Sequence, residues 1–158
     1  LTAALERYSW LAGIAMIGGA SKMNVNDAIL DGLQNSFEQT IDNIIKYSWY
    51  KDTGSFFKQK AKQRMLEAGS KVVHDDFYAC SRFDLTDKLA EIDTPALVIA
   101  SDYDRMVPLN VSQEMAGQLT GSIFIGLENC GHFQHIEQTG KVATEISSFL
   151  LHLRELGS

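Results

Sequence analysis

The sequence has no excess of basic residues: 14 lysines and arginines stand against 20 aspartates and glutamates, which gives a formal net charge of −6. A protein that binds nucleic acid neutralises phosphates with basic side chains, so we expect no nucleic-acid partner. The densest basic stretch, residues 58–64, falls on a predicted helix and is typical of a solvated helix face.

Long apolar stretches are also absent. A membrane-spanning helix needs about 20 consecutive apolar residues. The longest candidate, residues 10–20, is much shorter and is interrupted by Gly13, Gly18 and Gly19. It predicts a buried strand, and we expect no membrane partner.

Cysteine and proline are scarce, with two of each in the chain. Cys80 and Cys130 lie far apart in the sequence and match no metal-binding spacing. Because no signal peptide or disulfide framework accompanies them, we expect reduced thiols in a cytoplasmic protein.

What is present is the balance of a globular domain. The chain has 158 residues, of which 45% are hydrophobic and 22% charged, and this length allows one domain with its own core. Residues 11–18 and 96–100 are apolar on both faces, as expected for strands of a parallel sheet covered by helices on each side. Residues 122–127 form a third predicted strand.

Helical patterns occupy most of the remaining chain. The first helix is predicted by the apolar stripe Leu1, Ala4, Leu5 and Tyr8. The next begins at an N-cap, Asn24 or Asn26, and carries the stripe Leu30, Leu33, Phe37, Ile41, Ile44 and Ile45. After a break at residues 50–54, two more helices are predicted over 55–68 and around Val73, Phe77 and Cys80.

The carboxyl-terminal part alternates strands and helices. One helix is predicted after Pro108, and the last shows the stripe Val142, Ile146, Phe149, Leu150 and Leu153. Strand, helix, strand, helix predicts right-handed β-α-β crossovers and therefore an α/β fold. The long helical stretch between the first two strands looks like an insertion on the sheet.

Polar side chains follow the second and third predicted strands at the point where each strand ends. Asp102 and Asp104 lie in residues 101–108, the acid loop, and His132 lies in residues 128–133, the histidine loop. Loops past the carboxyl ends of parallel strands meet at one edge of the sheet, so we expect Asp104 and His132 to lie together. A carboxylate beside an imidazole fixes its tautomer and stabilises the imidazolium.

These two loops resemble those of the α/β-hydrolase fold superfamily. Residues 92–108 carry a proline, an apolar strand, a small residue, and then Asp104 followed four residues later by Pro108. The Cys-Gly-His-Phe stretch at 130–133, followed by Glu137 and an apolar helix, is similar to the Gly-His loop and last helix of that family. The family's triad order is nucleophile, acid, histidine, so the resemblance implies Asp104 as the acid and His132 as the base.

The resemblance implies a division of the chain into three parts. Residues 1–22 are similar to the end of the helix after the nucleophile and the next strand. Residues 23–88 are similar to an inserted helical cap that shapes an acyl pocket, and residues 89–158 to the core strands and helices with the two loops. Ser101, where glycine is usual, and Thr139, where proline is frequent, depart from the family without removing a chemical group.

The nucleophile of such an enzyme is absent from the sequence. The family's nucleophile elbow reads Gly-x-Ser-x-Gly, or has Cys or Asp at its centre, and the nearest stretch, residues 19–23, lacks the second glycine. The oxyanion loop is also absent. We therefore expect this chain, which begins at Leu1, to be the carboxyl-terminal portion of an α/β-hydrolase fold with about three parallel strands.

Other residues offer alternative chemistry. Asp102 is the fallback acid. Cys130, two residues before His132, is a substitute nucleophile that we do not favour. The set His132, His135 and Glu137 invites a metal interpretation, but His-x-x-His-x-Glu matches no known helical zinc motif, and we expect no metal. The aromatic residues between the first two strands are interpreted as cap core, some lining an acyl pocket: Phe37, Trp49, Tyr50, Phe56 and Phe57.

The resemblance implies a hydrolase of carboxylic esters or lactones that needs no cofactor. Two alternatives stay open: a self-contained enzyme with an unusual nucleophile or a water activated by His132, and a truncated, non-catalytic domain acting as an oligomerising or interaction module. The strand at residues 11–18 would lack a neighbour on one side, and an uncovered strand edge pairs with other chains. We therefore expect a partner, either the missing amino-terminal half or a second copy.

Overall fold

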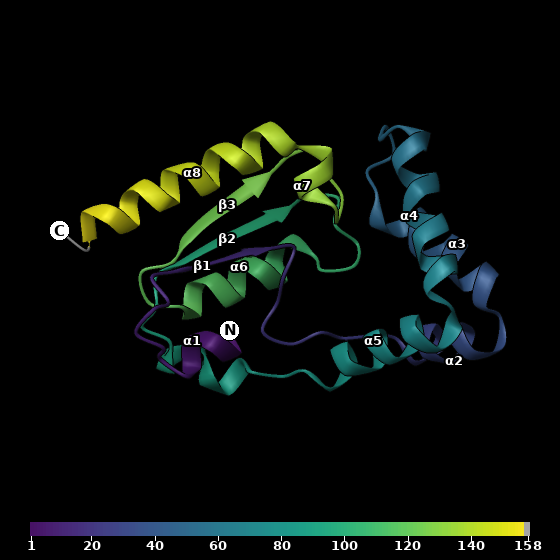
Figure 1. Ribbon diagram of the computed structural model, residues 1–158, viewed down its shortest axis with the longest axis horizontal. Coiled ribbons are helices and arrows are strands. Elements are labelled where there is room, and N and C mark those ends of the chain that lie inside the picture. Colours follow the sequence, from purple (N-terminus) through teal and green to yellow (C-terminus); the bar gives the residue numbers. More distant parts are fainter. Residues whose placement is uncertain (157–158) are drawn as a thin grey trace.

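A computed structural model describes residues 1–156 and contains a parallel sheet of three strands with helices on both faces (Figure 1). The strands are β1 (Ile14–Ile17), β2 (Ala96–Ser101) and β3 (Ile123–Leu127), in that order across the sheet. The predicted α/β fold class is confirmed. Residues 157–158, at the end of the third predicted part of the chain, lie outside the described range.

The helices follow the predicted order along the chain. They are α1 (Thr2–Leu5), α2 (Asp27–Asn35), α3 (Phe37–Ser48), α4 (Ser55–Ala68), α5 (Ser70–Arg82), the 3-10 helix η1 (Thr86–Glu91), α6 (Leu109–Gln118), α7 (Gln134–Glu137) and α8 (Thr139–Leu156). None of the helices in this described part of the chain has the length and apolarity that a membrane crossing requires.

The central strand β2 divides the sheet region into two cores. Successive side chains of a strand point to opposite faces, so Ala96 and Val98 join the core covered by α1, η1 and α6. Leu97 and Ile99 join the core covered by α8, where Phe149 packs. Every residue of β2 is buried, which explains why this strand is apolar on both faces.

Two predictions near the amino terminus are wrong. The first strand spans only Ile14–Ile17 rather than 11–18, because Leu11 packs against the core from a loop and Gly18 turns the chain with a φ of 61°. The first helix ends at Leu5, so Tyr8 is not on its apolar stripe. Tyr8 is 45% exposed and stacks on the ring of Trp10.

The helical stripe predicted through Ile45 belongs to two helices, not one. Asn26 is the N-cap of α2, since its Oδ1 accepts a hydrogen bond from the Ala28 N–H at 2.8 Å. Helix α2 ends at Asn35, and Ser36 leaves the helical conformation with φ −148° and ψ 50°. The break lets α2 and α3 fold back on each other.

The close approach of α2 and α3 depends on a glycine. A Cβ atom at Gly32 would collide with Oγ1 of Thr40 and lie 3.3 Å from its Cγ2. Thr40 is fixed there because its hydroxyl donates to the Ser36 carbonyl at 3.0 Å. Around this contact the helices bury their own core, separate from those of the sheet: Leu33, Ile41, Ile44 and Val73.

Residues 24–82, the helical segment, lie on the side of the sheet toward which the strands point (Figure 1). The chain leaves and re-enters the sheet region at a neck where Lys22 and Asp84 form an antiparallel bridge. There the Leu85 N–H donates to the Ser21 carbonyl at 2.8 Å, and the Lys22 ammonium lies 2.8 Å from the Asp84 carboxylate.

Some side chains assigned to the core are exposed. No residue of α4 is buried, so its basic stretch is a solvated face as predicted, but Phe56 (64% exposed) and Phe57 (45%) do not belong to a core. Trp49 is buried and Phe37 packs against the helical core, as predicted. On α8, Leu150 is 55% exposed, outside the stripe that faces the sheet.

The substitution Gly32→Ala tests the contact between α2 and α3. The added methyl group is expected to lower the free energy of unfolding by about 1–3 kcal/mol through overpacking, seen as a lower urea midpoint at unchanged slope. Combining it with Thr40→Ala removes the colliding atoms, so the double variant should lose less than the sum of the single variants.

Gly117→Ala is the matched control. Gly117 is a helical glycine on α6 with no atom within 4 Å of its added Cβ, so alanine should stabilise the chain by about 0.5–1 kcal/mol through helix propensity. Equal effects of the two glycine substitutions would contradict a specific contact at Gly32.

Candidate active site

The acid loop and the histidine loop run side by side beyond the ends of β2 and β3. The Asp102 N–H donates to the Leu127 carbonyl at 3.0 Å and the Tyr103 N–H to the Cys130 carbonyl at 3.1 Å. These bonds continue the pairing of the two strands into the loops. They bring Asp104 and His132 to the same level beyond the carboxyl ends of the two strands.

Asp104 and His132 are hydrogen-bonded, as the sequence predicts from their loops. Asp104 Oδ2 lies 2.8 Å from His132 Nδ1. The Asp104 side chain is fully buried, whereas the His132 side chain is 29% exposed. Because Nδ1 faces a carboxylate, the geometry assigns the proton to Nδ1 and leaves the lone pair on Nε2. That Nε2 makes no hydrogen bond within residues 1–156, so it is open to a reacting group.

The turn after Asp104 holds its carboxylate in place. Asp104 Oδ1 accepts hydrogen bonds from the backbone N–H groups of Met106 and Val107, both at 2.8 Å. This is the turn that an aspartate makes with backbone groups two and three residues on. Its Oδ2 is then directed at the imidazole.

A buried polar network lies beneath this pair, and sequence reasoning missed it. Gln134 is fully buried, and its Nε2 donates to Ser101 Oγ at 3.1 Å and to Asp104 Oδ2 at 3.4 Å. Ser101 Oγ in turn donates to the Gly131 carbonyl at 2.6 Å. The sequence shows a serine at position 101 where glycine is usual in the family, but the spacing does not indicate that Gln134 is its hydrogen-bond partner.

One acceptor of this network has no partner. Gln134 Oε1 is buried and makes no hydrogen bond within the described residues. It faces Gly18 at the end of β1, where a Cβ atom would lie 2.8 Å from Oε1 and 3.3 Å from His132 Nδ1. An unpaired buried polar group costs about 1–3 kcal/mol.

The helical segment contacts the histidine loop through its backbone. The His132 N–H donates to the Ser48 carbonyl at 2.7 Å. At Gly131 a Cβ atom would lie 2.5 Å from Tyr50 N and 2.8 Å from the Ser48 carbonyl oxygen, so only glycine permits this approach. The Trp49 ring stacks on Phe133 with centroids 4.4 Å apart.

Glu137 joins the same two parts of the chain. Its Oε2 accepts from the Tyr50 N–H at 2.9 Å and from the Thr53 hydroxyl at 2.7 Å, while its Oε1 accepts from the Phe133 N–H at 3.3 Å. The Glu137 carboxylate therefore binds groups of both the helical segment and the histidine loop. His135 is exposed on α7. Across residues 1–156, no three His, Cys, Asp or Glu side chains converge on one metal position.

The other sequence candidates do not contact His132 Nε2. Asp102 is exposed and its Oδ1 accepts from the Cys130 N–H at 3.3 Å, so it braces the histidine loop. Burial, reinforced by the negative charge of Glu137, raises the pKa of the Cys130 thiol to about 12. Cys130 is therefore a neutral thiol near pH 7 and a poor nucleophile. Ser21 lies in the neck, with its Oγ 3.4 Å from Thr86 Oγ1.

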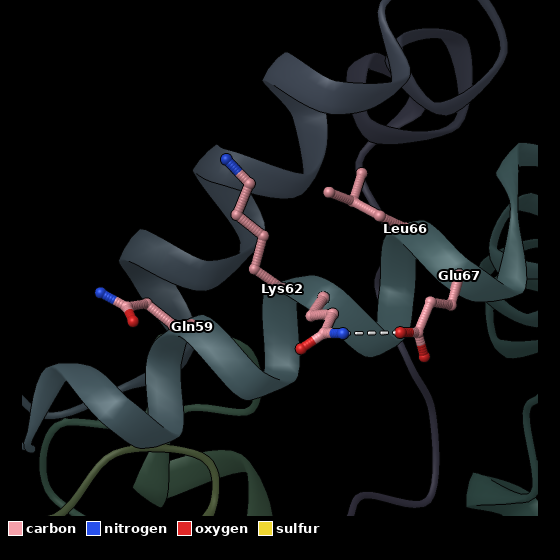
Figure 2. A pocket seen from close by; sticks show the side chains of 5 residues that line it. Gln59, Lys62, Leu66 and Glu67 are labelled. Carbon is pink, nitrogen blue, oxygen red and sulfur yellow. Dashed lines mark hydrogen bonds between the residues drawn. The ribbon is translucent and has the colours of Figure 1, made fainter.

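Two surface hollows lie away from the pair. The larger, about 460 Å³, is lined by residues of α4 alone, including Lys62 and Leu66 (Figure 2). There Gln63 Nε2 donates to Glu67 Oε1 at 2.8 Å. A second, about 230 Å³, lies between the helical segment and the histidine loop beside Glu137. Neither is lined by His132 or Asp104.

Gly131→Ala is expected to separate the helical segment from the histidine loop. The new methyl group would meet backbone atoms, which cannot rotate away, so the His132–Ser48 hydrogen bond should be lost. We expect the His132 amide proton to exchange with solvent at least about tenfold faster, as for a loss of local protection, measured by hydrogen exchange and NMR.

Gly126→Ala on β3 is the control for this substitution. Its added Cβ would make only ordinary contacts, 3.6 Å from Leu109 Cδ1 and 3.8 Å from Phe124 Cε1. His132 exchange should be unchanged in this variant. An unchanged rate in Gly131→Ala as well would show that the segment does not depend on the glycine.

Comparisons with known proteins find a family match and relatives of this chain. A family model described as the alpha/beta hydrolase fold matches residues 24–139. The monoacylglycerol lipase abhd6-B of Xenopus laevis is 28% identical over 111 residues, which is 63% of this chain and 33% of the lipase. The chain thus spans about a third of the length of this curated relative.

Two solved structures share the fold. An esterase from Exiguobacterium antarcticum superposes with a TM-score of 0.80 at 16% identity, over 87% of this chain and 56% of the esterase. An enol-lactonase from Burkholderia xenovorans superposes with a TM-score of 0.80 at 17% identity, over 87% of this chain and 55% of the lactonase. With the family match over most of its length, the chain belongs to the alpha/beta hydrolase fold family.

Proposed function

We propose that this chain supplies the acid and base of a hydrolase that acts on carboxylic esters or lactones. The observation that carries the proposal is the 2.8 Å hydrogen bond between Asp104 Oδ2 and His132 Nδ1, with His132 Nε2 unengaged. A buried carboxylate behind a partly exposed imidazole is the arrangement of a nucleophile–His–Asp triad. No nucleophile elbow occurs in the printed sequence, so the proposal assigns the nucleophile to a segment outside these residues.

The mechanism follows from the geometry of the pair. His132 Nε2 takes the proton of a serine hydroxyl as the oxygen attacks the acyl carbon, and Asp104 stabilises the imidazolium that forms. The imidazolium then gives its proton to the leaving oxygen, and water resolves the acyl-enzyme by the same route. No cofactor enters these steps.

The substrate class rests on the related proteins. Their names describe a monoacylglycerol lipase, an esterase and an enol-lactonase, all of which break an acyl–oxygen bond. A small-molecule ester or lactone is therefore the proposed substrate. The free thiols of Cys80 and Cys130 support a reducing compartment, and we place the protein in the cytoplasm.

Residues 23–88 are proposed to act as a cap over this site. The position of helices α2–α5 on the side toward which the strands point supports this role (Figure 1). So do the contacts of Ser48 and Tyr50 with the histidine loop. A cap so placed would shape the acyl pocket and exclude water from the reacting atoms.

Asp104→Asn tests the role of the pair directly. In the unsubstituted chain, nitrogen-15 NMR should show the His132 proton on Nδ1. An asparagine amide can turn its NH₂ toward Nδ1, which moves the proton to Nε2 and removes the base. A His132 tautomer that does not respond to Asp104→Asn would contradict the proposal.

Turnover is the second arm of this test. The 158-residue chain and its His132→Ala variant should hydrolyse p-nitrophenyl acetate at the same low rate, since nucleophile and oxyanion donors are absent. A chimaera that places the unmatched part of the Exiguobacterium esterase before Leu1 should hydrolyse it in a His132-dependent manner, with Asp104→Asn costing up to about 10⁴-fold. His132-dependent turnover by the chain alone would instead assign the nucleophile to this chain.

A second candidate function is a non-catalytic oligomerising module. Within residues 1–156, β1 pairs only with β2, so the other edge of β1 is open. An open edge in a parallel sheet favours pairing with another chain. This edge would receive either the amino-terminal half of the fold or a second copy.

The oligomeric state of the purified chain tests that pairing. We expect a dimer or larger assembly by size exclusion with light scattering. Lysine in place of Ala15, an exposed β1 residue, should shift the assembly toward monomer by placing a charge on the edge strand. A monodisperse monomer for the unsubstituted chain would contradict the expectation.

A further inference from the structure

The amide of Gln134 lies beneath the Asp104–His132 pair in a position that packing does not explain. The side chain is fully buried, yet its Oε1 has no hydrogen-bond partner within the described residues. An apolar side chain of the same shape would fill the space without leaving a buried acceptor unpaired. The hydrogen bonds that Nε2 donates therefore explain why an amide side chain occupies this position.

The hydrogen-bond network fixes which end of the amide faces Asp104. Ser101 Oγ donates its one proton to the Gly131 carbonyl at 2.6 Å, so it can only accept from Gln134. Asp104 Oδ2, the second neighbour, is a carboxylate oxygen and also accepts. Both contacts require the NH₂ group, which has two protons to donate.

Nε2 of Gln134 therefore contacts the same oxygen that binds His132. Asp104 Oδ2 lies 2.8 Å from His132 Nδ1 and 3.4 Å from Gln134 Nε2, while Oδ1 is held by backbone N–H groups. The carboxylate is thus fixed at both oxygens. Within the described chain, His132 and Gln134 make the hydrogen bonds to Oδ2.

Ser101 holds Gln134 in this position and links it to the histidine loop. Its hydroxyl bonds to the Gly131 carbonyl, one residue before His132, and it is fully buried at the end of β2. The two polar side chains thus connect the end of the central strand, the acid and the histidine loop. These hydrogen bonds account for the presence of a hydroxyl side chain at the buried end of β2.

We propose that Gln134, seated by Ser101, is a positioning residue that aligns the Asp104 carboxylate with His132 Nδ1. This inference rests on the proposed function of the pair. Gln134 acts through Asp104 and does not touch the reacting atoms. Its loss should weaken the alignment of the acid while leaving the fold in place.

The substitution Gln134→Met tests this role, because methionine has nearly the same length and shape but no amide. The readout is the low-field NMR signal of the His132 Nδ1 proton in a nitrogen-15-labelled chain. We expect this proton to exchange with water roughly tenfold faster, the size that losing one hydrogen bond to a charged group gives. The Nε2-protonated tautomer should rise with it.

Gln138→Met is the matched control. Gln138 lies one helical turn after Gln134, and its Nε2 donates to the Glu128 carbonyl at 2.5 Å rather than to the acid. Its Oε1 is also buried and makes no hydrogen bond to residues 1–156. The same chemical change here should leave the His132 Nδ1 signal unaltered. A general loosening of the fold would change the signal in both variants.

Ser101→Ala provides the second, independent variant. It removes the acceptor that seats Gln134, so it should change the Nδ1 signal in the same direction as Gln134→Met. The double variant should add little to either single change. An Nδ1 signal unchanged in both single variants would overturn the positioning role. If Asp104→Asn also left the signal unchanged, the proposed function itself would fail, so the two failures are distinguishable.

Discussion

The parallel pairing of β2 with a strand on each side is the constraint on which the rest of the molecule depends. Both neighbours run in the same direction, so the loops that carry Asp104 and His132 leave the sheet at one edge. Burial of β2 on both faces fixes its register, because a slip by one residue would exchange its two cores. The sheet therefore brings the two loops together, and the contacts within the loops set the distance between acid and base.

The parts of this arrangement that sequence could predict are those with local signals. Apolar strands, the helix limits at Ser55 and Ala68, and the meeting of Asp104 with His132 follow from periodicity and from the order of strands in a parallel sheet. The break at Ser36 was missed because the apolar stripe continues across it in helical phase. The chain turns at Ser36, and the close contact of Gly32 with Thr40 that the turn produces has no local signature.

The supporting residues of the site could not be predicted for a similar reason. In the sequence, Gln134 is an ordinary polar residue after the histidine loop. Only the fold places it between Ser101 and Asp104. Nothing in the sequence around Glu137 indicates that its carboxylate binds the Tyr50 N–H and the Thr53 hydroxyl. Hydrophobicity predicts Phe56 and Phe57 as cap core or pocket lining, and the core prediction is wrong because both are exposed on α4, which buries no residue.

The attachment of the helical segment at two places limits how it can move. The neck at Lys22 and Asp84 holds its ends, and the backbone contact between Ser48 and His132 holds its middle. Because it is attached at both places, the segment cannot move as a rigid body without displacing the backbone of His132. The least restrained helix is α4, which lies in the chain between Ser48 and Asp84 and has no buried side chain. Local unfolding of the helical segment should therefore begin at α4 and leave His132 in place.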